Sequence, residues 1–371
     1  MAKNGYICKK WDVKVKLKPI YIMKKTIFTL AMLCCTIVGN AQVTDEISAI
    51  LQVGDNAQIF YGADALIEAM AAAPDRGATI TLSSGTFNAA EITKCVNIYG
   101  AGWVTELSPK NNDNPADNSI LPTIINNTTN INLPAELAAP HNIHIEGIKF
   151  NGSFSSIIGS NPIDGLEVVK CYFTQVGANG SGFYDMENKN VHFTQCCITT
   201  GIFCAFYDMT LQNCYLSANG YGTTGIGHSD KEGSNLIFNH CILWSSNGGS
   251  NNRFICNNSI VSLYKKRTSQ IYRYCIMADA ELGADFLGSV NNWFGISWAD
   301  VFKDQANLDY SDTRTFELVN PAVYVGDDGT QVGVNGGNYP WNKAPHTPLV
   351  TDLKLAIDGT NLKVTYNAET R

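Results

Sequence analysis

A six-residue pattern recurs through the middle of the chain, and it limits the possible folds more than any other feature. An apolar residue, two mostly polar residues, a cysteine, one further residue and a second apolar residue follow one another. Four clear copies are Val168–Phe173, Phe193–Ile198, Leu211–Leu216 and Phe238–Leu243, and weaker ones are Ile145–Phe150, Cys256–Val261 and Tyr272–Met277. Their fourth positions, 148, 171, 196, 214, 241, 259 and 275, are 23, 25, 18, 27, 18 and 16 residues apart. This uneven spacing excludes a rigid helical repeat and indicates short strands joined by connections of variable length.

Each strand unit is too short to bury its apolar face alone, so neighbouring copies must stack as a solenoid. Turns that supply positive φ cheaply are expected after several strands. They are predicted at Asn151-Gly152, Asn179-Gly180, Asn219-Gly220 and Asn247-Gly248-Gly249. One circuit of strand and turn therefore takes roughly 20 residues.

With these repeats, and with Gly77–Phe87 and Ile92–Gly102 resembling opening rungs, the chain resembles the right-handed parallel β-helix proteins of the pectin-lyase-like fold. The resemblance covers about residues 55–300. It implies an all-β, single-stranded parallel β-helix solenoid of an exported bacterial surface protein. It implies no single activity, because the family includes lyases, hydrolases, adhesins and uncharacterised surface proteins.

The segments that flank the solenoid have patterns of their own. Residues 43–76 form a predicted N-terminal cap, whose helix lies between Asp64, a possible N-cap, and Pro74. The β-helix then covers residues 77–300, and a closing segment covers residues 301–345, where Asp327–Trp341 looks like the end of many exported bacterial β-helix proteins. Residues 346–371 alternate about an Asp-Gly turn and predict a β-hairpin or the start of a small module.

Residues 1–42 have the features of an export signal. Met23-Lys24-Lys25 is a short basic region, Ile27–Val38 is apolar, and Gly39-Asn40-Ala41 supplies small residues before a cleavage site at Gln42. We take Met23 as the expected true start. The apolar run is too short for a comfortable membrane span, so no transmembrane segment is expected after signal removal. The predicted location is extracellular, periplasmic or on the cell surface.

The net charge of the chain limits the classes of molecule that it is expected to bind. The whole chain has 26 basic and 33 acidic residues, but eight Lys and only one Asp lie in residues 1–42. The remaining chain therefore carries 18 basic and 32 acidic residues, a net charge of −14. Such a body repels phosphate backbones and polyuronates unless cations intervene. Nucleic acid is excluded as the expected partner.

Nine cysteines remain after residue 42: Cys95, Cys171, Cys196, Cys197, Cys204, Cys214, Cys241, Cys256 and Cys275. Parallel rungs are about 4.8 Å apart, but in-register side chains keep their Cβ atoms too far apart for a disulfide. We therefore expect a stacked interior column of small apolar thiols rather than a disulfide framework. Cys196 and Cys197 point to opposite faces of one strand, so Cys197 or Cys204 could pair with another thiol.

One candidate catalytic set contains Asp185, Asp208 and His228, at separations of 23 and 20 residues. The resemblance supports it, because polygalacturonase-like hydrolases place acid residues and a Gly-His motif on successive rungs. The distance to the repeat cysteines argues against it, because Asp185 lies 11 residues before Cys196 and Asp208 only 6 before Cys214. The two aspartates would therefore not stack on successive rungs. Glycosidic hydrolysis needs two carboxylates at a controlled separation, so the mismatch weakens the hydrolase reading.

A second candidate set is Lys265, Lys266 and Arg267, near Arg253 and Arg273. A β-elimination lyase needs a base that works near neutral pH and a cation, or Ca²⁺, to neutralise the uronate. The alternative is a solvated basic loop, and no Asp/Glu ladder for Ca²⁺ accompanies it. His141 and His144 flank Ile143, but no third ligand is evident, so no metal or cofactor is expected apart from Ca²⁺ in a lyase.

The third hypothesis is a non-catalytic glycan surface. Exposed aromatic rings stack on sugars, and amides and hydroxyls supply hydrogen bonds. The candidate rings are Tyr184, Tyr207, Tyr221 and Trp244, with Tyr172 and Tyr215 as further possibilities. We expect an exported β-helix protein that binds a polysaccharide or surface glycan, or mediates adhesion. A polysaccharide lyase or hydrolase, and a purely structural surface protein, stay open as alternatives.

Overall fold

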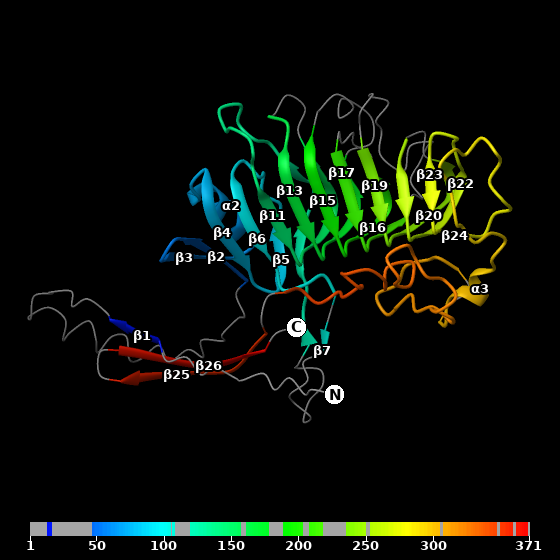
Figure 1. Ribbon diagram of the computed structural model, residues 1–371. Coiled ribbons are helices and arrows are strands. Elements are labelled where there is room, and N and C mark those ends of the chain that lie inside the picture. The colour runs from blue at the N-terminus through cyan, green and yellow to red at the C-terminus, as the bar shows by residue number, and fades with distance from the viewer. Residues whose placement is uncertain are drawn as a thin grey trace, which may run out of the picture. The chain divides into compact units, whose positions relative to one another are not determined.

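The computed structural model describes two compact units, residues 47–345 and residues 1–46 with 346–371. The described residues are 13–16, 47–104, 106–107, 119–156, 161–177, 188–202, 208–217, 235–249, 253–304, 307–346, 349–358 and 361–369. The larger unit is built on two long sheets, one of ten and one of eleven strands, which are parallel except where β2 (Ser48–Val53) pairs antiparallel with β3 (Asn56–Tyr61) and β4 (Arg76–Leu82) (Figure 1). The predicted parallel β-helix solenoid is therefore confirmed.

Strands of the two sheets alternate along the chain. The eleven-stranded sheet holds β2 (Ser48–Val53), β3 (Asn56–Tyr61), β4 (Arg76–Leu82), β6 (Cys95–Tyr99), β11 (Ile143–Glu146), β13 (Asp164–Val169), β15 (Lys189–Thr194), β17 (Asp208–Gln212), β19 (Asn235–Asn239), β21 (Ile255–Asn257) and β23 (Ile271–Arg273). The ten-stranded sheet holds β5 (Gly85–Asn88), β9 (Thr123–Asn126), β10 (Thr129–Ile131), β12 (Lys149–Ser156), β14 (Tyr172–Val176), β16 (Cys197–Ile202), β18 (Tyr215–Ser217), β20 (Ile242–Gly249), β22 (Ile260–Lys265) and β24 (Ile276–Met277). A short antiparallel pair, β7 (Glu106–Leu107) and β8 (Ser119–Ile120), stands apart from both.

From β11 onward the chain passes from the eleven-stranded to the ten-stranded sheet through two residues in every circuit. The first of the two has positive φ, and these residues, here called the turn column, are Gly147, Lys170, Gln195, Asn213, His240, Asn258 and Tyr274. The second is the fourth position of the sequence repeat. The predicted turn sites were wrong where the structure describes them, because Gly152 lies within β12 and Asn247–Gly249 within β20.

The cysteine column lies in the interior, as predicted, and its thiols are hydrogen-bonded. The Cys241 Sγ donates to the carbonyl of Asn239, 3.2 Å away, and lies 3.4 Å from the carbonyl of Leu211 on the previous rung. Ser259 occupies the same position one circuit later, and its hydroxyl accepts from the Cys241 N–H at 2.9 Å. All eight described cysteines after residue 42 are unpaired and buried. Burial raises the pKa of Cys171 and Cys197, so both thiols stay protonated.

This hydrogen bonding predicts different tolerances at Cys241. Serine should cost less than about 1 kcal/mol of unfolding free energy, because a hydroxyl makes the same bonds at position 259. Valine should cost about 1–3 kcal/mol, because it makes none and adds bulk to a packed turn. Denaturant unfolding measures both variants, and equal costs would contradict the proposed hydrogen-bonding role of the column.

The solenoid interior is closed at its N-terminal end by α2 (Ala65–Ala72), whose Ala65, Leu66, Ala69 and Met70 side chains are buried in the main core. Asp64 lies at the N-cap position, but its side chain makes no capping hydrogen bond. Its carboxylate accepts from Asn88 Nδ2 at 2.7 Å instead. The helix therefore covers the core, as expected of a cap, without the predicted Asp64 cap bond.

A second core lies outside the solenoid. It forms where the outer face of the ten-stranded sheet packs against the closing segment, residues 301–345, and α3 (Trp298–Val301). Cys197 is fully buried here as a free thiol, not as a disulfide partner. Arg314 lies deep in this core with its guanidinium against the rings of both Phe302 and Phe316. Among the residues that the structure describes, both faces of the ten-stranded sheet are thus covered, whereas the outer face of the eleven-stranded sheet is open.

The closing segment also runs along the turn column and is held by its side chains. Lys170 Nζ donates to the carbonyl of Ala344 at 2.5 Å. Asn213 Nδ2 donates to the carbonyls of Val334 and Gly336 at 2.8 and 2.7 Å. His240 Nε2 lies 2.9 Å from Asp328 Oδ2. These bonds explain why residues in such turns are long or amide-bearing rather than glycine alone.

The smaller unit is an antiparallel sheet of β1 (Val13–Lys16), β25 (Leu349–Asp358) and β26 (Asn361–Glu369). Strands β25 and β26 form the predicted hairpin, with Asp358 opposite Asn361 at its turn. Within the described parts of the chain, no helix has the length and apolarity that crossing a membrane requires.

Candidate functional site

The open face of the eleven-stranded sheet carries a row of side chains in register. From His144 onward each lies four residues before the cysteine column, and all of them stand at the same height on successive strands. The row consists of Asn97, His144, Glu167, His192 and Thr210, followed by Ile237, Ile255 and Ile271. This row is therefore polar or ionisable over its first half and apolar over its second half.

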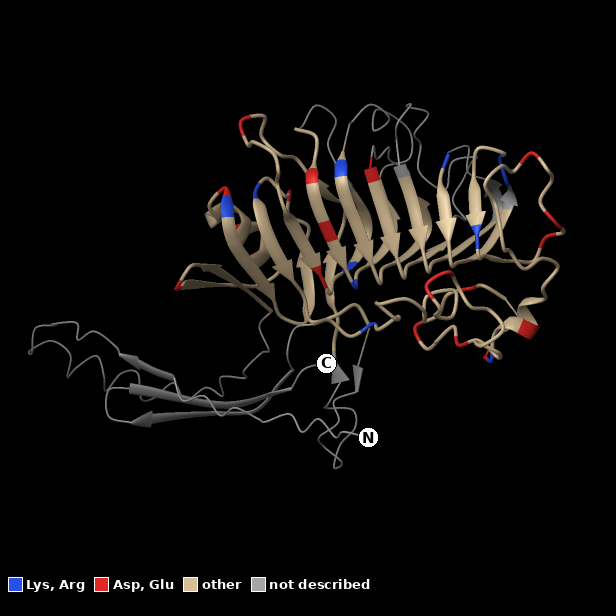
Figure 2. Cartoon of the chain, viewed as in Figure 1, with Lys and Arg blue, Asp and Glu red and all other residues tan. Residues whose placement is uncertain are grey.

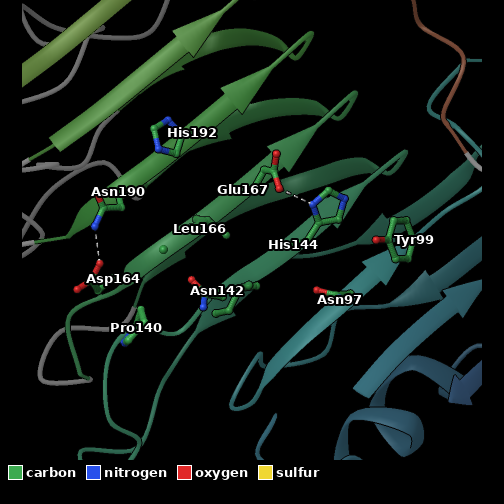
Figure 3. A pocket seen from close by; sticks show the side chains of 12 residues that line it. Asn97, Tyr99, Pro140, Asn142, His144, Asp164, Leu166, Glu167, Asn190 and His192 are labelled. Atoms are coloured by element: carbon green, nitrogen blue, oxygen red, sulfur yellow. Dashed lines mark hydrogen bonds and ion pairs between the residues drawn. The ribbon is translucent and has the colours of Figure 1, made fainter. Parts of the chain in front are cut away.

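A groove of about 570 Å³ opens over the polar half of this row (Figure 3). Its walls come from strands β6, β11, β13 and β15 and from the connection that enters β11. The lining residues are Asn97, Tyr99, Pro140, Asn142, Ile143, His144, Asp164, Gly165, Leu166, Glu167, Asn190 and His192. Amides, carboxylates, imidazoles and one phenol thus face the same space, and Lys and Arg are not among them.

His144 is held between two carboxylates. Its Nδ1 lies 2.9 Å from Glu167 Oε2 and its Nε2 lies 3.2 Å from Glu146 Oε2. Glu146 is nearly buried, whereas the Glu167 side chain is 60% exposed. Burial alone would lower the pKa of His144, but hydrogen bonds to Glu146 and Glu167 and their charges outweigh it and raise the pKa. The imidazolium can donate from both nitrogens at once, which is the form that this geometry requires.

Tyr99 forms the end of the groove beside this cluster. Its ring lies 5.1 Å from the His144 ring, at an interplanar angle of 37°. Burial raises the pKa of Tyr99, and the charges of Glu146 and Glu167 raise it further. The phenol therefore stays protonated and serves as a hydrogen-bond donor and an apolar face, not as a base.

The opposite end of the groove is fixed by a buried histidine. The backbone N–H of Asp164 donates to His141 Nδ1 at 3.0 Å, and His141 Nε2 donates to the carbonyl of Leu137 at 3.0 Å. Arg76 holds the same connection through the carbonyls of Pro140, at 2.7 Å, and Ala138. The Asp164 carboxylate is left at the groove, where it accepts from Asn190 Nδ2 at 2.7 Å.

The raised pKa of His144 gives a testable pH dependence. A group whose pKa rises on folding stabilises the fold fully below its ordinary pKa of about 6.5, and this contribution disappears as the pH rises through the folded value. The ring-proton NMR titration of His144 should have its midpoint above 6.5, and Glu167→Gln should lower it. Glu91→Gln should leave the midpoint unchanged, because Glu91 is exposed and does not line the groove. A midpoint at or below about 6.5 would contradict the double ion pair.

The structure brings few of the sequence-predicted site residues together. Asp208 is the first residue of β17, beside β15, and its N–H donates to the Asn188 carbonyl at 3.2 Å. Lys266 Nζ pairs with Asp279 at 2.6 Å, Arg267 is exposed beside it, and Lys265 ends β22. Trp244 packs, half-buried, against the second core, as Tyr172 does, and Tyr215 is buried within it. The other candidates, Asp185, His228, Tyr184, Tyr207 and Tyr221, lie outside the described residues.

Sequence reasoning missed the groove residues Tyr99, His144, Glu146, Asp164 and Glu167 as a set. The signal was present in the repeat itself. Counting back four positions from the cysteine column yields a run of His, Glu, His and Thr, and then three isoleucines. An ionisable run on one outward position of a stacked repeat indicates a continuous polar surface, since equivalent positions lie side by side.

The lining of the groove, as far as the structure describes it, is mostly polar and includes no metal centre. Among the described side chains, no group of three or more His, Cys, Asp or Glu is placed to hold a metal ion. The groove offers donors, acceptors and one aromatic face to a hydroxyl-rich molecule.

Comparisons of the chain with protein-family profiles, with curated proteins and with solved structures found no match.

Proposed function

We propose that the chain is an exported glycan-binding or adhesion protein with a pectin-lyase-like β-helix, and that its groove over β6, β11, β13 and β15 holds the glycan. The observation that carries the proposal is the register of polar side chains across these strands, beneath a cavity of about 570 Å³. Strands repeat about every 4.8 Å, so hydrogen-bonding groups recur along the groove as hydroxyls recur along a polysaccharide. Tyr99 supplies the ring on which a sugar face can pack.

The charges favour binding over uronate elimination. A lyase needs a free base and a cation against the uronate carboxylate. Both nitrogens of His144 are engaged by carboxylates, Tyr99 keeps its proton, and Lys and Arg do not line the groove. An uncharged or cationic glycan suits this surface, whereas a polyuronate meets like charge.

Hydrolysis is the second candidate, and one observation favours it. Glu146 and Glu167 bracket the same imidazolium, one nearly buried and the other exposed. Carboxylates in unlike environments are what acid and base roles in glycosidic cleavage require. If this candidate holds, the groove would cut the chain that it binds.

The test is a polysaccharide panel on the purified protein, with and without Ca²⁺. Pull-down, reducing ends and unsaturated-uronate absorbance are measured together. We expect retention of intact polymer, weakened about tenfold by Tyr99→Ala or Glu167→Ala and unchanged by Glu91→Ala. Melting temperatures confirm that each variant is folded.

Two outcomes overturn the binding proposal. New reducing ends that are lost in Glu146→Gln and Glu167→Gln would establish hydrolysis instead. Silence in all three measurements across the panel would favour a structural surface protein.

A further inference from the structure

The groove has an uneven balance of charge. The carboxylates of Asp164 and Glu167 line it, and that of Glu146 lies behind His144. Against these three carboxylates stand two lining imidazoles, those of His144 and His192. Figure 2 shows acidic positions on the strands of this face. A ligand in the groove therefore meets more negative than positive charge.

The charged groups that the structure describes on the surrounding elements do not reverse this balance. Arg76 is committed to the carbonyls of Pro140 and Ala138 on the entering connection. Lys189, the register neighbour of Asp164 on β15, does not line the cavity. Asp208, which begins the next strand β17, adds a further carboxylate on that side.

The pKa shifts of two groups in the groove indicate the sign of its electrostatic potential. The imidazole of His144 gains affinity for its proton from Glu146 and Glu167 despite its burial. The phenol of Tyr99 loses its proton less readily, in part because of the same two charges. Both shifts mean that the groove stabilises a positive group and disfavours a negative one. A ligand ammonium would experience the same field.

We propose that the groove selects glycans that carry unmodified amino groups, and that ammonium groups on different hexosamine units lie against the carboxylates of Glu167 and Asp164, which stand at different ends of the groove. The inference rests on the proposed function, because it names the class of glycan for the same groove. An ammonium donates to a carboxylate in charge-assisted hydrogen bonds, while the neighbouring hydroxyls match Asn97, Asn142 and Asn190. N-acetylation removes the positive charge of the amino group and enlarges the substituent, and a uronate carries a negative charge instead.

The expected preference is modest because the groove is open to solvent. An exposed ion pair contributes about 0.2–1 kcal/mol, and two carboxylates acting together give about a tenfold preference at low salt. The preference should shrink as salt rises, because exposed charges are screened.

The experiment is calorimetric titration of the full chain at about pH 6, where a sugar amine is charged. The probes are a β-1,4-linked glucosamine hexamer, its fully N-acetylated counterpart and a galacturonate hexamer. We expect affinities in that order, with about tenfold between the first two. The double variant Asp164→Asn, Glu167→Gln should abolish the difference, and repeating the titration at about pH 9 should abolish it in the unchanged protein.

The controls separate the possible failures. Glu91→Gln removes an exposed carboxylate outside the groove and should keep the tenfold difference; if it reduces the difference as the double variant does, the attraction is nonspecific and the inference is wrong. Equal binding of the two glucosamine-type hexamers would overturn the inference and leave glycan binding standing. No binding of any hexamer, together with silence across the polysaccharide panel, would overturn both.

Discussion

Replacing Arg314 by alanine should lower the free energy of unfolding by about 3–5 kcal/mol, because it removes a buried, hydrogen-bonded cation from the second core. Arg314 is only 3% exposed, and its guanidinium lies 5.1 and 4.4 Å from the ring centres of Phe302 and Phe316. It donates to the backbone carbonyls of Asn307 and Asp309, so it ties a loop to the core. Burial lowers its pKa to about 10, yet it remains charged at neutral pH.

Denaturant unfolding measures this loss, with Arg314→Lys as the matched variant. Lysine keeps the charge and most of the stem but cannot bridge two carbonyls with a planar fork, so an intermediate loss is expected. Lys303→Ala is the control, because Lys303 forms only an exposed pair with Glu317 and should cost less than about 1 kcal/mol. A loss at Arg314→Ala no larger than this control would refute the anchoring role.

Asn213→Ala should cost about 2–4 kcal/mol and should loosen the closing segment along its length. The Asn213 side chain is fully buried and donates to the carbonyls of Val334 and Gly336, which would lose their partner without access to water. Its backbone has a φ of 51°, a conformation that costs alanine about 1 kcal/mol. Hydrogen exchange of residues 332–341 should accelerate together with the loss of stability.

Two matched variants separate the causes. Asn213→Gly removes the side chain without the conformational penalty, so it should retain most of the loss. Asn127→Ala has the conformational penalty at a φ of 69° on an exposed residue, so it should cost only about 1 kcal/mol. If Asn127→Ala is as costly as Asn213→Ala, the hydrogen bonds to the closing segment are not the source of stability.

The repeat predicted the solenoid because the fourth position of each six-residue copy lies in a two-residue turn of fixed geometry. It did not predict the second core, although from residue 172 onward the position after the fourth one is aromatic, aliphatic or a thiol, as at Tyr215, Ile242, Ile260 and Ile276. Consecutive apolar residues across a strand mean that both of its faces are covered. Which segment covers the outer face depends on contacts between residues about a hundred positions apart, and no local pattern encodes them.

The groove could not be predicted from the sequence for a related reason. The residues that define it are spread over β6, β11 and β13, and each alone has the ordinary sequence context of a polar position on an exposed strand face. Only the strand register makes Asn97, His144 and Glu167 neighbours. The aromatic residues that composition favours for sugar stacking include Tyr215 and Trp244, which pack against the second core instead. Their pattern is the same in either role, so sequence alone could not separate the two.

The constant two-residue turn has a consequence for how such a chain can change over generations. One edge of the solenoid cannot gain or lose a residue without breaking the closing segment's bonds, as at Lys170 and Asn213. At the opposite edge, where each strand of the ten-stranded sheet ends and the next strand of the eleven-stranded sheet begins, the number of residues between the two strands already differs, from five between β16 and β17 to seventeen between β18 and β19. Insertions and deletions can accumulate there without shifting any strand. That edge borders the Asp164 end of the groove, so relatives of this protein could acquire new ligands by loop replacement while keeping every rung.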